Sequence, residues 1–348
     1  KDKVRATPVA AKGGTYRIVA VGDTMIGSDF PSPILYAPLT RDAAPAKILG
    51  PTLARLLAPG RNKVVFANVE GTIHSRAKPH KTCRSNCYVF RMPPHYAGIL
   101  KRVGFNLVSL ANNHAGDFLA PGRRATFRNL QKVGMKAAGI DMPGMRTATL
   151  VLSDGTKVGL AAFAPNPGTL PINNLARATK IVRDLSRRVD IAIVSFHGGA
   201  EGMHATRVPR RMEIAYGERR GDVYRFAHAM VNAGADVVIG HGPHVPRGVE
   251  VYKRRFIAYS LGNFWTYGRF NIRSIAGQGP VVDIRVDKQG RVVAARIHST
   301  RQHSRGVPRY DPTGAAARTV AGLTAKDFPE AKLRFDAKGR ITGPGIRR

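Results

Sequence analysis

The segment ADVVIGHGPH, residues 235–244, runs from an apolar stretch into a turn that carries two histidines. The mostly apolar residues 235–239 predict a buried strand, and the glycines and proline that follow predict a sharp turn at its end. His241 and His244 therefore arrive together at a strand end, and imidazole is a common ligand of Zn, Mn, Fe and Ni in proteins. Two solvated or hydrogen-bonded loop histidines would give the same pattern, so the rest of the chain has to decide between these interpretations.

Short apolar runs alternate with amphipathic helical patterns along the chain before residue 248. After it, β-rich runs flank KRR at 253–255 and DKQG at 287–290, which predicts two antiparallel hairpins. This mixture predicts one α/β domain with two sheets and with helices on the outside. The expected strands are 16–21, 64–67, 105–110, 136–139, 157–163, 190–196, 236–239, 248–252, 256–260, 280–286 and 291–297, and the expected helices are 93–103, 121–133, 174–188 and 222–233.

We divide the chain of 348 residues into three parts. Residues 1–14 are polar and basic and predict a flexible arm, and residues 15–305 predict the folded domain. Residues 306–348 are rich in Gly, Pro, Ala and Arg without a long period, and we expect an irregular C-terminal extension. The chain begins at Lys1 rather than Met, and we expect that a signal or anchor segment has been removed and that the protein is extracytoplasmic.

The charge balance is strongly basic, with 56 Lys and Arg against 22 Asp and Glu, a formal net charge of +34. Nucleic-acid binders usually concentrate such charge on one face with interleaved aromatic residues, whereas here it is spread from end to end, so no specific nucleic-acid binding is expected. A generally solvated cationic surface is one interpretation. The other is attraction of an anionic polymer, a phosphorylated substrate or an anionic cell-envelope surface.

The two cysteines of the chain are Cys83 and Cys87. A close pair without other cysteines favours a short local disulfide in an oxidising compartment. A zinc site would need further ligands, such as His74 and His80.

Polar residues with metal-ligating side chains follow five of the expected strands. Each has an ordinary explanation taken singly, for example a turn or cap for an Asp, but their joint occurrence at the carboxyl ends of strands indicates one site. They are Asp23, Glu70 (with Asn68), Asn113 with His114, His197, and His241 with His244.

Oxygen ligands combined with several imidazoles suit one or two divalent ions, with Zn, Mn and Fe all compatible. Such a centre lowers the pKa of bound water, polarises a phosphoryl or acyl oxygen and clamps the transition state. The Asn113 carbonyl would ligate metal, while His114, not itself a ligand, would protonate the leaving group.

These motifs give the chain a resemblance to the CapA family, the bacterial capsule or poly-γ-glutamate synthesis proteins, whose fold is similar to that of calcineurin-like metallophosphoesterases. The resemblance spans roughly residues 16–300 and leaves the tail after about 306 uncovered. The segments that carry it are VGDTMIG (21–27), NVEG (68–71), LANNH (110–114), SFHGGAE (195–201), GADVVIGHGPH (234–244), GVEVY (248–252) and YSLGNF (259–264).

The resemblance implies a four-layer α/β/β/α sandwich of two mixed β-sheets flanked by helices. It implies a metal centre of one or two divalent ions, with Glu70 where the relatives have a bridging Asp and His114 as the catalytic acid. Asp23, Glu70, Asn113, His197, His241 and His244 would be the metal ligands.

The chain departs from the phosphoesterase pattern in two places. Asp-x-His of the first motif is Asp23-Thr24-Met25 here, and the final His-x-His is His241-x-x-His244, which puts a two-metal site in doubt. Glu201, four residues after His197, could ligate metal, act as general base, or pair with an arginine.

We therefore expect an extracytoplasmic, metal-dependent hydrolase of capsule or poly-γ-glutamate metabolism that acts on an anionic polymer or phosphoester. The alternative is a non-enzymatic capsule export or anchoring component that uses the same fold to bind an anionic polymer. The sequence leaves the substrate, the metal and the oligomeric state open.

Overall fold

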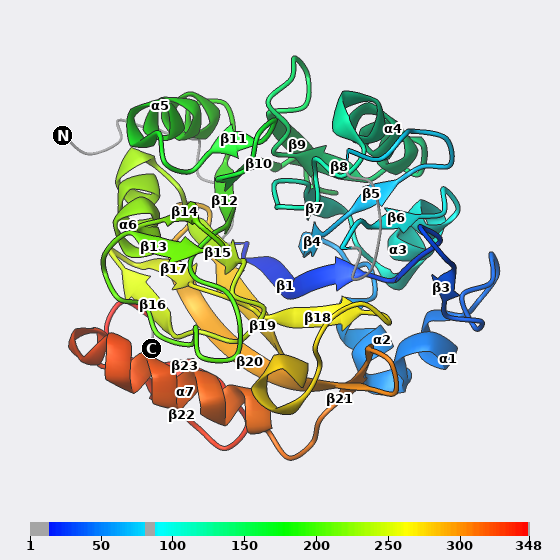
Figure 1. The fold of residues 1–348 in the computed structure, drawn as a ribbon. Coiled ribbons are helices and arrows are strands. Elements are labelled where there is room, and N and C mark those ends of the chain that lie inside the picture. Colours follow the sequence, from blue (N-terminus) through cyan, green and yellow to red (C-terminus); the bar gives the residue numbers. More distant parts are fainter. Residues whose placement is uncertain (1–13, 81–87, 347–348) are drawn as a thin grey trace.

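A computed structural model describes residues 14–80 and 88–346 (Figure 1). The expected basic arm at 1–14 therefore lies almost wholly outside the described residues, and the expected disulfide between Cys83 and Cys87 lies outside them altogether. Within the described ranges, no helix is both long enough and apolar enough to span a bilayer.

In this part of the chain, ten strands form the larger sheet. Its central strands β1 and β4 run parallel, while β19 pairs with β1 in the antiparallel direction, so the sheet is mixed. Its strands are β1 (Tyr16–Met25), β4 (Lys63–Val69), β7 (Leu107–Ser109), β8 (Lys136–Ala138), β18 (Asn263–Thr266), β19 (Gln278–Val286), β20 (Val292–His303), β21 (Val307–Tyr310), β22 (Arg334–Phe335) and β23 (Arg340–Thr342).

The second sheet has seven strands in the described residues and is also mixed. Strands β10, β12, β15 and β17 are parallel neighbours, with antiparallel partners β9 and β16 at the sides. Its strands are β9 (Thr147–Val151), β10 (Lys157–Ala164), β11 (Leu170–Pro171), β12 (Ile191–His197), β15 (Val237–His241), β16 (Val249–Tyr252) and β17 (Arg255–Ala258). Both hairpins predicted after residue 248 are confirmed, as β16–β17 and β19–β20.

The remaining elements are short strand pairs and helices. The pairs are β2 (Gly27–Ser28) with β3 (Ile34–Leu35), β5 (Thr72–Ile73) with β6 (Arg91–Met92), and β13 (Glu213–Ala215) with β14 (Glu218–Gly221). The α-helices are α1 (Pro45–Leu49), α2 (Pro51–Leu57), α3 (Tyr96–Val103), α4 (Leu119–Lys132), α5 (Leu175–Ser186), α6 (Val223–Ala233) and α7 (Ala315–Asp327), and the 3₁₀ turns are η1 (Ser274–Gly277) and η2 (Pro329–Ala331).

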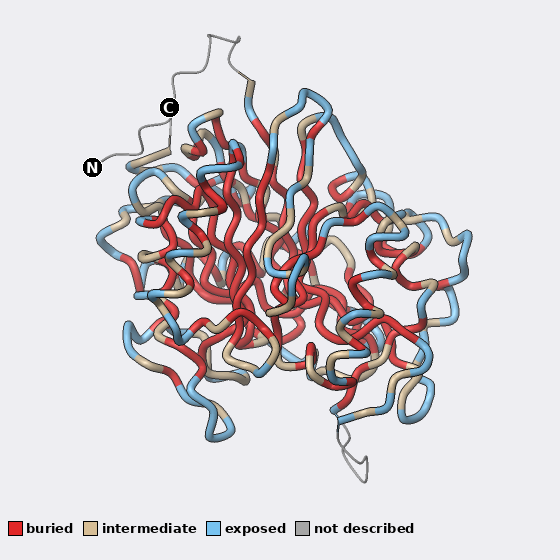
Figure 2. The backbone as a smooth tube through the Cα atoms, turned by 90° about the horizontal axis from the view of Figure 1, so that it is seen from above, coloured by how far each residue is buried: buried red, intermediate tan, exposed pale blue. Residues whose placement is uncertain are grey.

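Alternation of side chains along the strands explains the layers. In β4, Val64 and Phe66 pack into the core between the two sheets, whereas Val65 and Ala67 pack with α1 to α4 on the other face. The second sheet repeats this arrangement, since its outer face packs against α5 and α6. Figure 2 shows buried residues concentrated in the central strands, and the predicted four-layer α/β/β/α sandwich is confirmed.

The prediction of an irregular extension at 306–348 was wrong. Strand β21 pairs with β20, β23 pairs with β20 and β22, and α7 packs against β19 and β20. The sequence does not reveal this segment because its helix buries one valine and otherwise only alanine and polar residues. These residues are Ala316, Ala317, Val320, Thr324 and Asp327. These give a much weaker periodic signal than the leucines and valines of α5.

Candidate metal centre

Five of the six predicted ligands, all except Asn113, come from both sheets and lie close together where the parallel strands end. Asp23 lies on β1, Glu70 directly follows β4, and His197 and His241 are the last residues of β12 and β15. His197 and His241 are also direct neighbours in the sheet register. Asp23, Glu70, His197 and His241 have no exposed surface. Parallel pairing within each sheet and packing of one sheet on the other thus bring four distant segments to one buried point.

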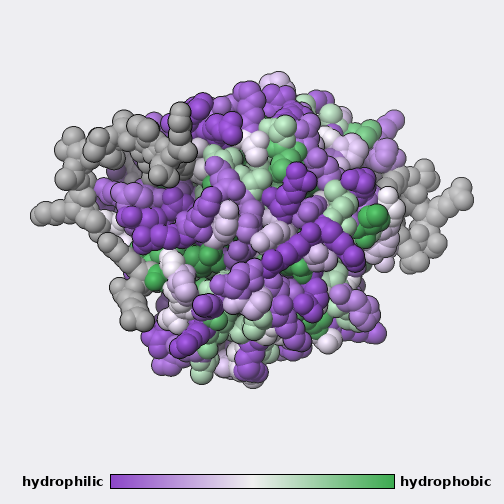
Figure 3. Space-filling model, turned by 90° about the vertical axis from the view of Figure 1, so that its left-hand side faces the viewer, coloured by the Kyte–Doolittle hydropathy of each residue, from purple (hydrophilic) through white to green (hydrophobic). Residues whose placement is uncertain are grey.

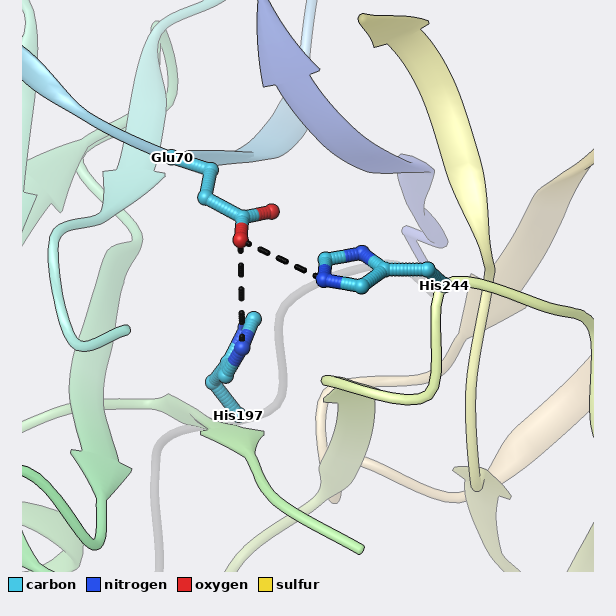
Figure 4. Close-up of side chains that lie close together, drawn as sticks. All are labelled: Glu70, His197 and His244. Atoms are coloured by element: carbon cyan, nitrogen blue, oxygen red, sulfur yellow. Dashed lines mark ion pairs between the residues drawn. The ribbon is translucent and has the colours of Figure 1, made fainter. Parts of the chain in front are cut away.

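Glu70, His197 and His244 form a three-residue group whose ligand atoms are close enough to hold one metal ion (Figure 4). Oε1 of Glu70 lies 4.0 Å from Nε2 of His197 and 3.5 Å from Nε2 of His244, and one ligand atom of each residue lies within 4.8 Å of the others. Both oxygens of Glu70 and Nε2 of His197 are buried and have no hydrogen-bond partner among the described residues. Since burying such atoms without partners is costly, this set of oxygen and nitrogen donors fits a divalent cation.

Asp23 lies behind the imidazole of His244. Its Oδ2 is 2.9 Å from Nδ1 of His244, so the opposite nitrogen of the same ring faces Glu70. Its Oδ1 accepts a hydrogen bond of 2.8 Å from Nδ2 of Asn68 and lies 3.4 Å from Nδ1 of His241. A carboxylate on the far nitrogen of an imidazole fixes the tautomer and the direction of the ring, which is the usual arrangement around protein-bound metals.

The protonation of the cluster follows from burial and from these contacts. Burial lowers the pKa of His197 well below its ordinary value, so this imidazole is neutral and able to ligate metal. Burial also raises the pKa of Glu70 well above its ordinary value. For Asp23 burial is outweighed by His241 and His244, which hold its pKa well below the ordinary value. Burial also acts to lower the pKa of His244, but the nearby carboxylates of Glu70 and Asp23 outweigh burial and raise this pKa to about 10. The carboxylates thus create a site that favours positive charge.

His114 lies at the edge of this cluster, and its Nε2 is directed toward Glu70. Its Nδ1 is 2.9 Å from Oδ2 of Asp117, and its Nε2 faces Glu70 Oε1 at 4.0 Å. The ring of Phe90 packs on the imidazole with centroids 4.0 Å apart, and the Phe90 backbone N–H donates to the same Asp117 oxygen at 2.7 Å. Asp117 and Phe90 therefore fix the direction of the His114 ring, with Nε2 toward the cluster.

The two asparagines before His114 have different environments. Nδ2 of Asn112 donates to Oδ1 of Asn68 at 3.2 Å and to the Val69 carbonyl at 2.8 Å, which holds the loop against the end of β4. Asn113, the predicted ligand, is half-buried, and its Oδ1 is buried without a hydrogen-bond partner in the described ranges. That free oxygen leaves Asn113 chemically able to ligate a metal, and its role stays a prediction.

Glu201 lies on the solvent side of the cluster. Its Oε1 is 3.5 Å from Nε2 of His244, and its Oε2 is 3.3 Å from a terminal nitrogen of Arg220. The side chains of Glu201 and His244 retain 16% and 13% of their exposure, so this part of the cluster reaches solvent. The predicted pairing of Glu201 with an arginine is thus present, and Glu201 also lies close to the histidine cluster.

The departure at the first motif has a structural counterpart. Met25 replaces the histidine of the phosphoesterase pattern and is fully buried in the core on the helix side of the larger sheet.

The sequence analysis did not identify Asp117 and Arg220, which both contact residues of the candidate site. The His114-x-x-Asp117 spacing was an available signal, because residues three apart in a helical turn can face each other. Arg220 had none, since the chain is rich in arginine throughout.

Fold and site together define a four-layer α/β protein with a buried carboxylate–histidine cluster at the ends of its parallel strands. The family model described as "Bacterial capsule synthesis protein PGA_cap" matches residues 17–267. The chain belongs to this family, which includes the CapA proteins of capsule and poly-γ-glutamate synthesis.

Sequence similarity to two CapA proteins supports the same family assignment. The chain is 32% identical to the capsule biosynthesis protein CapA of Bacillus anthracis over 181 residues, which are 47% of this chain and 41% of the relative. It is 31% identical to the PGA biosynthesis protein CapA of Bacillus subtilis over 191 residues, 49% and 46% of the respective chains. The matches thus span less than half the length of these relatives.

A solved structure similar to this chain is a putative 5'-nucleotidase from Staphylococcus aureus in complex with alpha-ketoglutarate. The TM-score is 0.45 at 15% identity, and the match covers 80% of this chain and 52% of that one.

Proposed function

We propose that this protein is a divalent-metal-dependent hydrolase that acts outside the cytoplasm on an anionic polymer or phosphoester in capsule or poly-γ-glutamate metabolism. The observation that carries the proposal is the group of Glu70, His197 and His244, whose ligand atoms lie within 4.8 Å of one another. Among the described residues, both Glu70 oxygens and Nε2 of His197 are buried without a hydrogen-bond partner. His114 beside this group provides an oriented proton donor, which a purely structural metal site would not need.

Glu70, His197, His241 and His244 would hold the ion, with Asp23 as a further ligand or as the carboxylate that orients His244, and with Asn113 completing the set. When bound, a divalent ion would activate water and polarise the phosphoryl or acyl oxygen of a substrate.

The chain's own residues would handle the protons. His114, held by Asp117 at Nδ1, would donate from Nε2 to the leaving group. Glu201 would accept a proton from the attacking nucleophile at the solvent side of the cluster, near His244. Acid and base would then lie on different loops, one after β7 and one after β12.

The charge of the protein supports an anionic substrate. The net charge is +34, and the face that carries α5 and α6 is mostly hydrophilic (Figure 3). On α5, Lys180 retains 75% of its side-chain exposure, and Arg187 just after the helix retains 71%, and these two positive charges share one acidic partner, Asp184. Such a surface raises the local concentration of polyanions and speeds their association, in a manner that added salt weakens. Phosphoesters and poly-γ-glutamate are both attracted, so charge alone does not choose between a phosphoester and a γ-glutamyl amide bond.

The test is a metal analysis combined with an activity screen of the purified chain. Protein stripped with a chelator would be reloaded with Zn, Mn or Fe and assayed against phosphomonoesters, phosphodiesters and poly-γ-glutamate. We expect about one ion per chain and turnover of one substrate class that disappears after chelation.

Two variants distinguish residues that bind the metal from residues that act only in the reaction. His241→Ala should lose both metal and turnover, whereas His114→Asn should keep the metal and lose turnover. Fewer than about 0.2 ions per chain in the wild type would reject the hydrolase, because protein metal sites of this kind normally retain their ions. Binding of poly-γ-glutamate without metal or turnover would instead support the capsule export or anchoring component.

A further inference from the structure

Arg220 joins the two loops that carry the histidines of the candidate metal centre. It lies on β14 and retains only 1% of its exposure. Its Nε donates to the carbonyl of Gly199 at 3.2 Å, and Nη2 donates to the carbonyl of Gly242 at 3.4 Å. Gly199 follows His197 by two residues, and Gly242 lies between His241 and His244. One guanidinium thus fixes the main chain on both sides of the cluster.

The same guanidinium also holds the side chain of Glu201. Nη2 of Arg220 lies 3.3 Å from Oε2 of Glu201, and the other carboxylate oxygen lies 3.5 Å from Nε2 of His244. Glu218, at 3.6 Å from Nη1, pairs with the opposite side of the guanidinium and is half exposed. Glu201 therefore lies between a buried arginine and a histidine of the cluster, and its position depends on both.

An arginine this close to a cation site has two opposed effects. Its positive charge repels a metal ion, while its fixed contacts hold the loops and Glu201 in the geometry that binds one. The carboxylate of Glu201 lies between the two positive charges and reduces the repulsion. The positioning effect is possible because a guanidinium carries its five N–H donors on a rigid plane, so one buried arginine can donate to several acceptors at once.

On this basis, and resting on the proposed metal-dependent function, we propose that Arg220 is a positioning residue of the metal centre, which sets Glu201 against His244 and fixes the His197 and His241–His244 loops. Removing the guanidinium then weakens metal binding, even though it removes a repelling positive charge. Lysine in its place keeps the charge but cannot reach both carbonyls and Glu201 together.

Arg247 provides a matched control. It is equally buried, at 1% exposure, and forms a two-point ion pair with Glu213 at 2.9 and 2.7 Å. Its Nε donates to the carbonyl of Ala205 at 2.7 Å. Within residues 14–80 and 88–346, the Arg247 side chain forms no hydrogen bond or ion pair with Glu201 or His244. Glu213 also accepts a hydrogen bond of 2.9 Å from the Ala200 N–H, so Arg247 supports the same loop indirectly, through Glu213. Removing Arg247 should therefore cost folding stability while the contacts of Arg220 with Gly199, Gly242 and Glu201 remain.

The experiment measures the affinity of Zn and of Mn by competition with a chromophoric chelator, and the stability of the metal-free protein by thermal unfolding. The variants are Arg220→Met, Arg220→Lys, Glu201→Gln, Arg247→Met and the Arg220→Met/Glu201→Gln double variant. We expect Arg220→Met and Arg220→Lys to weaken metal binding by about 10- to 100-fold, while Arg247→Met changes it by less than about 2-fold. The double variant should bind metal about as weakly as Arg220→Met, because Arg220 acts partly through Glu201.

The outcomes separate this inference from the proposed function. Wild-type protein that binds no metal rejects the proposed function itself. Wild-type protein that binds metal while Arg220→Met binds it equally well or more tightly overturns only the role of Arg220, and tighter binding would show that charge repulsion dominates. Equal losses of affinity in Arg220→Met and Arg247→Met would assign Arg220 a general structural role and would also overturn the inference. If Arg220→Met does not fold, Arg220→Lys and Glu201→Gln carry the test.

Discussion

Asp23 and His244 are 221 positions apart in the chain, and Oδ2 of the aspartate lies 2.9 Å from Nδ1 of the histidine. This contact joins the end of β1 in the larger sheet to the loop after β15 in the second sheet. It directs the other nitrogen of His244 toward Glu70 and Glu201, at 3.5 Å from each. The position of one imidazole thus depends on both sheets and on their packing, and several testable consequences concern the residues around it.

Glu70→Gln should separate metal binding from folding. The substitution removes a charged ligand, and we expect metal affinity to fall by at least about 100-fold. Both Glu70 oxygens are buried and accept no hydrogen bond in the described part of the chain, and burial raises the pKa of Glu70 well above its ordinary value. Burying this charge thus costs the metal-free fold more free energy than its contact with His244 at 3.5 Å returns. Metal-free Glu70→Gln should therefore unfold at the same temperature as metal-free wild type or higher.

The measurement is thermal unfolding with and without a chelator, together with metal titration. Glu250→Gln serves as control, because Glu250 is also buried but accepts hydrogen bonds from Tyr259 at 2.9 Å and lies 3.0 Å from His228. That variant should lose stability and keep its metal affinity. A large loss of stability in metal-free Glu70→Gln would contradict the view that Glu70 is held ready for a cation.

His114 and Asp117 should affect turnover rather than metal content. His114→Asn removes the proton donor, and we expect turnover to fall by roughly 100-fold or more while metal per chain stays constant. Asp117→Asn leaves the imidazole in place but removes its 2.9 Å partner, so a smaller loss of turnover is expected. The check is steady-state kinetics on protein of measured metal content. Loss of metal in His114→Asn would make His114 a ligand instead.

His74 should make the fold sensitive to acid. It retains 3% of its exposure, and its ring packs edge-on against Phe118 with centroids 4.5 Å apart. Burial, assisted by the positive charge of Arg91, lowers the pKa of His74 from 6.5 to about 4. As pH falls from about 6.5 to about 4, the unfolded chain takes up a proton that the folded chain refuses, so stability decreases by up to roughly 3 kcal/mol.

Denaturant unfolding of the wild type and of His74→Gln across this pH range measures the effect. The stability of His74→Gln should depend less on pH by about this amount, whatever its absolute stability. His204→Gln, at an exposed position, is the matched control and should retain the wild-type dependence. Identical pH dependence of wild type and His74→Gln would rule out this role for His74.

Gly22→Ala should damage both the fold and the site. A Cβ at position 22 would lie 2.0 Å from the carbonyl oxygen of Gly262, which also accepts a hydrogen bond from the Asp23 N–H at 2.9 Å. Strands β1 and β18 would have to separate, and we expect a loss of at least about 3 kcal/mol together with weaker metal binding. Gly98→Ala in α3 is the control, since a Cβ there meets nothing within 4 Å, and it should stabilise by about 0.5–1 kcal/mol. Chemical unfolding of both variants gives the comparison.

Much of the fold could be predicted from the sequence because its strands are short apolar runs and its helices have clear apolar faces. The strand expected at 190–196 is β12 at Ile191–His197, and the helix expected at 222–233 is α6 at Val223–Ala233. The ligand residues could be named for a related reason: parallel strands deliver whatever follows them to a common edge. Glu70 and His197 could be predicted as ligands from their position at the end of an apolar run alone.

Other features depend on neighbours far away in the chain. The segment after residue 306 gains its order from contacts that no local pattern reports, such as the Val249 N–H donating to Thr324 Oγ1 at 2.9 Å and the pairing of β23 with β20. Arg220 looks like any other arginine in the sequence and becomes special only through its burial beside Glu201.

The sequence by itself thus determined the elements, their alternation and the residue types at the strand ends, because these follow from local apolar periodicity and turn chemistry. Only the tertiary structure decided which nitrogen of His244 faces Glu70, that Asp117 orients His114, and that Asn112 rather than Asn113 fixes the loop against β4. These are directions of side chains, and they are set by the packing of two sheets whose contacting residues lie far apart in the chain.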